Sequence, residues 1–219
     1  MKKNLIWVLA ATLFCGVLTT SCEKKTEVIP LIPGQEEPEQ PEQLRNLESL
    51  SVKYEASASD EVKANYQQVG TAYVRYVDAT GAVKDELFTG AFTKAVTIPI
   101  TQSGVNAALQ VIIVPKDGFD ISDIGDSLNV STNMTFSFAV NYDDNTCSET
   151  ITFSTATKDC APVPFLRPSN YSRYVDRFGG FVPAMVQLGF TVEKTEYGIS
   201  TKGPVYSAAT FWRENAFKK

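Results

Sequence analysis

The stretch that decides the fold reads Leu50-Ser51-Val52-Lys53-Tyr54-Glu55-Ala56. Its even positions are apolar and its odd positions are polar, as in a β-strand that buries one face and exposes the other. Short apolar or alternating segments of the same kind follow, separated by turn-forming residues. They are residues 72–77, 82–88, 96–100, 109–114, 134–142 and 151–153. The pattern predicts an antiparallel, mainly β domain.

Three local signals indicate where strands lie in the sheets. Asp78-Ala79-Thr80-Gly81 predicts a hairpin turn between the segments on either side of it. Pro99 has no backbone donor, so its strand is expected at a sheet edge. The run from Leu109 to Val114 is apolar except for Gln110, which is typical of a central strand covered on both faces.

The segment after residue 133 carries a resemblance to a known family. Residues 134–142 (Met-Thr-Phe-Ser-Phe-Ala-Val-Asn-Tyr), their Asp-Asp-Asn turn and residues 149–157 resemble the last hairpin of a fibronectin type III or Ig-like domain. Residues 73–77 are similar to a middle strand of such domains. The resemblance covers roughly residues 46–158 and implies a fold only, because this fold hosts many functions. We expect an Ig-like or fibronectin III-like sandwich over residues 44–160, with Ile151 and Phe153 on its inner face.

Residues 161–219 have a different character. Tyr171, Tyr174, Val175 and Phe178 follow helical spacing, Ser169 is placed to cap a short helix, and Gly179 is placed to end it. The remainder contains strand-like runs, which either add strands to the sandwich or form a small appendage packed on it. We favour a C-terminal mixed appendage that contains the short helix.

The first residues read as an export signal. Lys2 and Lys3 precede an apolar stretch over residues 5–18, which is too short for a stable membrane-spanning helix. Leu18-Thr19-Thr20-Ser21-Cys22 follows and resembles the lipobox of bacterial lipoproteins, in the loose form common in Bacteroidota. The resemblance implies a lipoprotein signal peptide over residues 1–21 and an acylated Cys22, with chains such as palmitate holding the protein to the membrane.

Residues 22–43 read as a tether. Prolines recur among glutamates and glutamines in this segment, so it has little to bury and favours extended conformations. The domain is therefore expected in the cell envelope, anchored by lipid to the outer membrane. The sequence leaves open whether it faces the surface or the periplasm.

Composition excludes several kinds of chemistry. The chain has no histidine and a formal net charge of −5. The missing histidines remove Ser-His-Asp and Cys-His catalysis and histidine zinc ligation, and the acidic balance makes nucleic acid a poor partner. Carboxylates, lysine or tyrosine are left for acid/base chemistry, and a pair of carboxylates is sufficient for glycoside hydrolysis. We expect a protein that is not an enzyme and needs no cofactor.

Cys147 and Cys160 are candidates for a disulfide, because exported chains meet oxidising conditions. Such a bridge would contribute about 3 kcal/mol to stability. A single extended strand over residues 148–157 would instead hold the two thiols roughly 30 Å apart, too far to bridge. The sequence leaves both alternatives open.

Two weaker sites lie in one loop. Carboxylates recur at every third residue and suit a hard cation such as calcium, with a solvated loop as the alternative. These are Asp117, Asp120, Asp123 and Asp126. The tripeptide Asp126-Ser127-Leu128 resembles the O-glycosylation sequon of Bacteroidota secreted proteins, which implies modification of Ser127.

Aromatic and basic residues alternate along the predicted helix and suggest a binding surface. They are Tyr171, Arg173, Tyr174, Arg177 and Phe178. The alternative is that these rings only pack the C-terminal segment onto the sandwich, which helical periodicity favours.

The resulting hypothesis is a non-catalytic envelope lipoprotein with a binding or assembly role, whose ligand is a glycan or an envelope protein. Two alternatives are a carboxylate-dependent glycan-active enzyme and a structural subunit of a surface appendage.

Overall fold

A computed structural model describes residues 46–101, 104–195, 198–202 and 208–218. The predicted signal peptide, Cys22 and the predicted tether lie outside the described residues. Residues 42–219 form one compact unit. None of the helices in the described ranges has the length and apolar character needed to cross a membrane.

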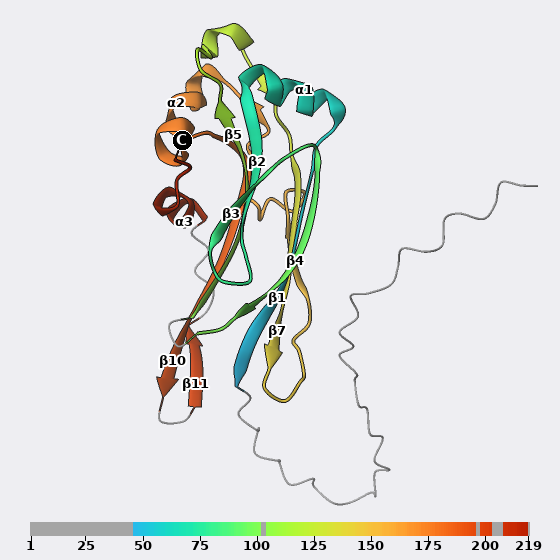
Figure 1. The fold of residues 1–219 in the computed structure, drawn as a ribbon, viewed down its shortest axis with the longest axis vertical. Coiled ribbons are helices and arrows are strands. Elements are labelled where there is room, and N and C mark those ends of the chain that lie inside the picture. Colours follow the sequence, from blue (N-terminus) through green and yellow to red (C-terminus); the bar gives the residue numbers. More distant parts are fainter. Residues whose placement is uncertain (1–45, 102–103, 196–197, 203–207, 219) are drawn as a thin grey trace, which may run out of the picture. The chain divides into compact units, whose positions relative to one another are not determined.

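Two antiparallel sheets form the body of this unit (Figure 1). The first sheet has the strand order β4-β1-β7-β8. Its strands are β1 (Leu47–Ser57), β4 (Ala91–Pro99), β7 (Asn133–Tyr142) and β8 (Ile151–Ser154). The central pair β1 and β7 is in register from Ser49 opposite Asn141 to Ser57 opposite Asn133.

The second sheet has the order β11-β10-β5-β2-β3. Its strands are β2 (Gly70–Val77), β3 (Val83–Leu87), β5 (Val105–Pro115), β10 (Phe181–Thr195) and β11 (Gly198–Lys202). Among the residues that the structure describes, β11 pairs with the last residues of β10 alone, from Thr191 to Thr195. A separate two-stranded sheet joins β6 (Leu128–Asn129) to β9 (Phe165–Leu166).

The strand predictions from local pattern are confirmed. All four apolar positions of the opening stretch are buried, and they are Leu50, Val52, Tyr54 and Ala56. The turn after β2 forms as expected, with Gly81 at φ +80° and the Asp78 carboxylate accepting hydrogen bonds from the backbone N–H groups of Thr80 and Ala82. Pro99 lies on the edge strand β4, and β5 is central.

The Ig-like order of connections is not confirmed. The run 73–77 belongs to β2 in the second sheet, whereas the hairpin of β7 and β8 belongs to the first. The two segments that carried the resemblance therefore lie in different sheets. The architecture is that of a mainly β sandwich.

Ile151 was expected to be buried on the inner face of the sandwich, and this prediction is wrong. Ile151 pairs with Phe138, whose ring is in the core, but the Ile151 side chain is 49% exposed. The reason is that β8 is a short edge strand, so little of the second sheet covers it.

Tyr54 links the two sheets. Its hydroxyl, fully buried on β1, donates a hydrogen bond of 2.9 Å to the carbonyl oxygen of Val77 at the end of β2. Its ring lies 5.6 Å from the rings of both Tyr76 and Phe136. Burial raises the pKa of this hydroxyl, an effect that a backbone hydrogen bond from Ala108 on β5 opposes. One side chain thus contacts both layers.

The helix α1 (Asp60–Val69) was not predicted. Its N-cap is Ser59, whose hydroxyl accepts a hydrogen bond from the backbone N–H of Val62, and two acidic residues follow in the first turn. The buried positions Val62, Tyr66 and Val69 pack this helix across the end of the sandwich (Figure 1).

The helix α2 (Pro168–Phe178) forms where the aromatic spacing predicts it and ends at Gly179 in the left-handed conformation. Ser169 does not cap it. The N-cap is Arg167, whose backbone N–H donates to Asn170 Oδ1, because Pro168 already occupies the first helical position.

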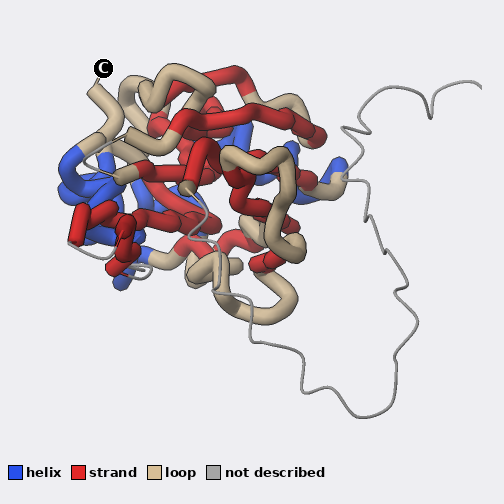
Figure 2. The backbone as a smooth tube through the Cα atoms, turned by 90° about the horizontal axis from the view of Figure 1, so that it is seen from below, coloured by secondary structure: helices blue, strands red, loops and turns tan. Residues whose placement is uncertain are grey.

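The C-terminal residues are part of the sandwich, contrary to the expected appendage. Residues 181–190 of β10 pair with β5. The helix α3 (Ala208–Glu214) packs on β10 and buries Trp212 completely. Most helical residues gather on one side of the strands (Figure 2). Pairing with β5 saturates backbone groups that a separate domain would have to satisfy itself.

We predict that Tyr54→Phe lowers the free energy of unfolding by about 1–3 kcal/mol, because it leaves the buried Val77 carbonyl without its partner. Urea denaturation of residues 44–219 measures this. The control is Tyr171→Phe, whose hydroxyl makes no hydrogen bond within the described residues, and we expect a change within about 0.5 kcal/mol. Equal effects of the two substitutions would show that the hydrogen bond from Tyr54 to Val77 adds nothing to the free energy of unfolding.

Candidate binding pocket

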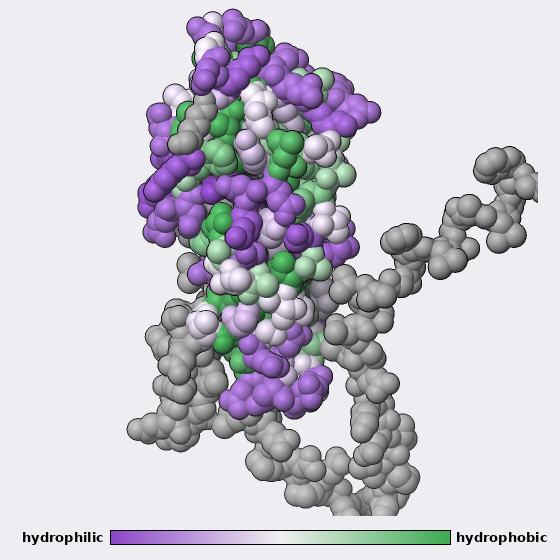
Figure 3. Space-filling model, viewed as in Figure 1, coloured by the Kyte–Doolittle hydropathy of each residue, from purple (hydrophilic) through white to green (hydrophobic). Residues whose placement is uncertain are grey.

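A half-open pocket of about 320 Å³ lies where α1 meets β2 and the end of β3. This volume falls at the lower end of the range of small-molecule sites and fits one ring-sized or side-chain-sized group. The lining residues are Lys63, Tyr66, Gln67, Gly70, Thr71, Ala72, Leu87, Phe88 and Thr89. In Figure 3, hydrophilic residues cover α1 and apolar residues lie directly below it.

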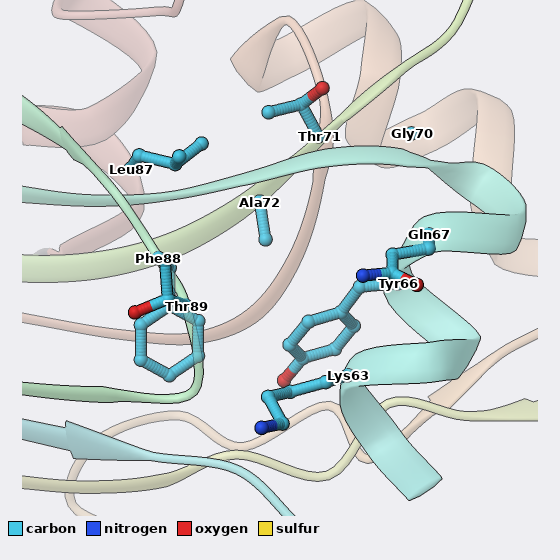
Figure 4. Close-up of a pocket in the computed structure, with 9 residues that line it drawn as sticks. All are labelled: Lys63, Tyr66, Gln67, Gly70, Thr71, Ala72, Leu87, Phe88 and Thr89. Atoms are coloured by element: carbon cyan, nitrogen blue, oxygen red, sulfur yellow. The ribbon is translucent and has the colours of Figure 1, made fainter. Parts of the chain in front are cut away.

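The inner wall of the pocket is apolar and fixed. Ala72, Phe88 and Tyr66 face one another across the space in Figure 4, and the two rings lie 6.2 Å apart. The Tyr66 hydroxyl is engaged at 2.5 Å with Thr132 Oγ1, which holds the ring in place. Burial raises the pKa of Tyr66 to about 12, so this wall is uncharged at neutral pH. It can contact an apolar group without rearrangement.

The rim of the pocket carries free polar groups. The side chains of Gln67, Thr71 and Thr89 are exposed and form no hydrogen bond within the described part of the chain. Lys63 is tied at 2.6 Å to Asp60 at the start of α1, an exposed pair that contributes little to stability. An apolar wall with hydrogen-bonding groups at its mouth suits a ligand that has one apolar face and a polar edge.

Two glycines allow the walls of the pocket to approach each other closely, because they have no Cβ atom. A Cβ atom at Gly70 would lie 1.9 Å from the carbonyl oxygen of Val114, so only glycine lets β2 begin beside β5 here. Gly90 has φ +108°, and a Cβ atom there would lie 2.2 Å from Cδ of Lys63. The aliphatic part of Lys63 is therefore packed against the chain that leaves β3.

The predicted aromatic surface on α2 is mostly a packing surface. Phe178 is 3% exposed, and the Tyr174 ring lies 5.8 Å from it and 5.0 Å from Phe181. Tyr171 packs at 5.6 Å against Phe119. The rings thus pack inward, which is the alternative that periodicity favoured.

Only the basic members of that predicted surface stay exposed. Arg173 and Arg177 project from α2 between the inward-facing rings. They do not line the pocket.

The four aspartates do not converge on a cation site. Within the described residues, no group of three or more acidic or cysteine side chains is arranged to hold a metal ion. The reason is local: Asp120 caps the 3₁₀ helix η1 (Ile121–Ile124), and its carboxylate accepts hydrogen bonds from the backbone N–H and hydroxyl of Ser122. Asp123 lies within η1, Asp117 precedes it and Asp126 follows it in the sequence, and the four carboxylates form no common cluster.

The predicted bridge between Cys147 and Cys160 is not formed, because Cys160 is a free thiol with no exposed surface. Cys147 lies beside Asn141 on β7, whereas the Cys160 backbone N–H bonds to Ser154, which pairs with Thr135. Six residues of β7 therefore separate the two positions, roughly 20 Å. The two cysteines therefore do not bridge each other. The single extended strand over residues 148–157 is not observed either, because β8 is only four residues long, and Cys147 is itself disulfide-bonded while Cys160 is free.

Ser127 is exposed just before β6, where an enzyme can reach it. Its modification stays a prediction. Cys22 lies outside the described residues, and its acylation stays a prediction as well.

The pocket residues were missed by sequence reasoning. One signal could have found them: Ser59 followed by two acidic residues, with Val62, Tyr66 and Val69 at helical spacing, marks α1. Nothing local indicates that this helix meets the end of β3.

No family model, curated protein or solved structure matches this chain.

We predict that Cys160 is unreactive in the folded protein near neutral pH. It is fully buried, and burial together with the nearby Asp159 raises the pKa of its thiol to about 12, so the reactive thiolate is scarce. Mass spectrometry after iodoacetamide treatment should find Cys160 alkylated only when guanidinium is present. Rapid alkylation of the native protein would contradict this placement.

Proposed function

We propose that this chain is a non-catalytic, lipid-anchored protein of the cell envelope whose sandwich binds a glycan or an envelope protein through the pocket at α1. The observation that carries the proposal is the pocket itself, with its fixed apolar wall and its free polar rim. A preformed pocket needs no ordering before it binds, which favours affinity.

The position of the pocket supports this role. The chain enters the sandwich at Leu47, and β1 then runs eleven residues to Ser57 before α1 begins. At ~3.3 Å per residue this strand spans roughly 33 Å. The pocket therefore lies at the far end of β1 from the segment that precedes it. A tether acylated at Cys22 and joined at Leu47 would leave the pocket end away from its attachment.

Outer-membrane localisation, an acylated Cys22 and an Ig-like relationship belong to the same proposal. The lipobox resemblance and the proline-rich tether support the first two. The arrangement of β1, β4, β2 and β5 in two facing antiparallel sheets supports the third.

We predict that the native protein is acylated at Cys22. Mass spectrometry of its N-terminal peptide should give a chain that begins at this cysteine and carries fatty acyl groups. Cys22→Ser should abolish the acylation and release the protein from the membrane fraction. An unacylated chain that begins at Met1 would contradict the proposed location while leaving the pocket untouched.

We predict that filling the pocket abolishes binding. Thr71→Trp places an indole at the mouth of the pocket. The probe is the glycan or peptide that the wild-type protein binds best on an array, and the affinity of the variant for this probe should be at least about tenfold lower. The matched control is Ala64→Trp, on the exposed side of α1 and outside the lining, which should bind normally. Thermal melting should show that both variants stay folded.

Two results would contradict the pocket. The wild-type protein could bind no glycan or peptide on the arrays, or the Thr71→Trp variant could bind as tightly as the control. Either result would contradict binding through the pocket. Acylation of Cys22 is tested independently by the mass spectrometry described above.

A further inference from the structure

The two outer faces of the sandwich differ. The outer face of the second sheet is covered by the chain itself, through α3 and the residues that follow it. In Figure 1, no helix lies alongside the middle of β1, β4 and β7 on the other side. The described residues thus leave the outer face of the first sheet bare.

This bare face is uncharged over most of its extent. The register places the odd positions of β1 on it, together with the residues opposite them on β4, β7 and β8. We call these residues the hydroxyl face. Its members are Ser49, Ser51, Lys53, Glu55, Ser57, Ala91, Thr93, Ala95, Thr97, Pro99, Asn133, Thr135, Ser137, Ala139, Asn141, Thr152 and Ser154. Of these, Ser49 is buried at the end of the face.

The hydroxyl face is flat because its side chains are short, and several are tied down within the face. Asn141 donates to both Ser49 and Ser51 at 2.9 Å, and the hydroxyls of Ser137 and Thr152 lie 3.0 Å apart. A solvated sheet face normally carries long charged side chains. Short bonded side chains lose little conformational entropy when another surface packs on them.

The two charges of the hydroxyl face are adjacent and opposite. Lys53 Nζ lies 2.8 Å from the Glu55 carboxylate on the same strand, with the two side chains 52% and 38% exposed. Two copies can stack these faces around a two-fold axis that lies between them. The axis runs perpendicular to the strands and passes β1 at the level of Tyr54. This arrangement would place Lys53 of each copy opposite Glu55 of the other copy. The face is therefore complementary to itself in charge.

The area is sufficient for a specific but weak pair. Three strands of nine to eleven residues and the four-residue β8, about 4.8 Å apart, present about 540 Å² per copy, or about 1,100 Å² in total. Specific interfaces begin near this size. A shared plane of two acylated anchors would raise the local concentration of the copies.

We propose that the hydroxyl face binds a second copy of this chain, forming a two-fold dimer in which the first sheets stack face to face with Lys53 opposite Glu55. This inference does not depend on the pocket, which lies at the α1 end and shares no residue with the hydroxyl face.

Charge substitutions test the geometry. Residues 44–219 contain the whole described core, and analytical ultracentrifugation of this fragment should show a concentration-dependent dimer. Lys53→Glu alone and Glu55→Lys alone should each weaken it at least about tenfold, since each places like charges opposite one another twice. An equimolar mixture of the two variants should form a heterodimer, and the double exchange K53E/E55K should restore self-association. Glu61→Lys on α1 is the control for net charge.

Three outcomes would overturn the proposal. The wild-type fragment could stay monomeric up to millimolar concentration, or the control could weaken the dimer as much as the charge reversals do. The longer fragment from residue 23 could also stay monomeric while residues 44–219 dimerise, which would assign the face to the preceding segment of the same chain. Circular dichroism of each variant shows that a loss of dimer is not a loss of fold.

Discussion

The rest of the structure depends on β5 having no solvent face. Every residue from Ala107 to Val114 is buried, because β2 and β10 flank the strand, the first sheet covers one face and the C-terminal segment covers the other. Such a strand cannot be stable until both covers are in place. The last residues of the chain therefore belong to the core: Trp212 is completely buried, and its indole N–H donates to the Val186 carbonyl.

Arg75 on β2 binds the C-terminal cover, which is α3 together with the residues that follow it. Its side chain is nearly buried, with Nε donating at 2.6 Å to Asp85 and Nη1 at 2.7 Å to the Asn215 carbonyl, while the guanidinium lies over the rings of Trp212 and Phe217. A buried cation is tolerated when its donors and its faces are occupied in this way. Because this cover lies over the second sheet alone, the outer face of the first sheet is left open for the proposed dimer.

Sequence reasoning predicted the parts of the fold that depend on local pattern and missed those that depend on distant partners. Alternation in 50–56 and the apolar run of β5 are strong signals because each strand meets the core along its whole length. The pairing of β10 with β5 joins segments about seventy residues apart, and no local pattern encodes it. For the same reason the pocket was missed, since α1 meets the end of β3 only after the hairpin closes. The aromatic spacing of α2 located the helix and favoured inward-packing rings, but it did not indicate which residues those rings contact.

Native-state hydrogen exchange tests most directly whether the two sheets and the C-terminal cover form one cooperative unit. We expect the backbone amides of β1, β5 and residues 181–189 of β10 to exchange through one shared opening with one free energy, and Trp212→Ala to lower the protection of all three together. If residues 181–189 instead exchanged at a lower free energy, and Trp212→Ala left β5 and β1 unchanged, the C-terminal segment would be a separable appendage and this account would be contradicted.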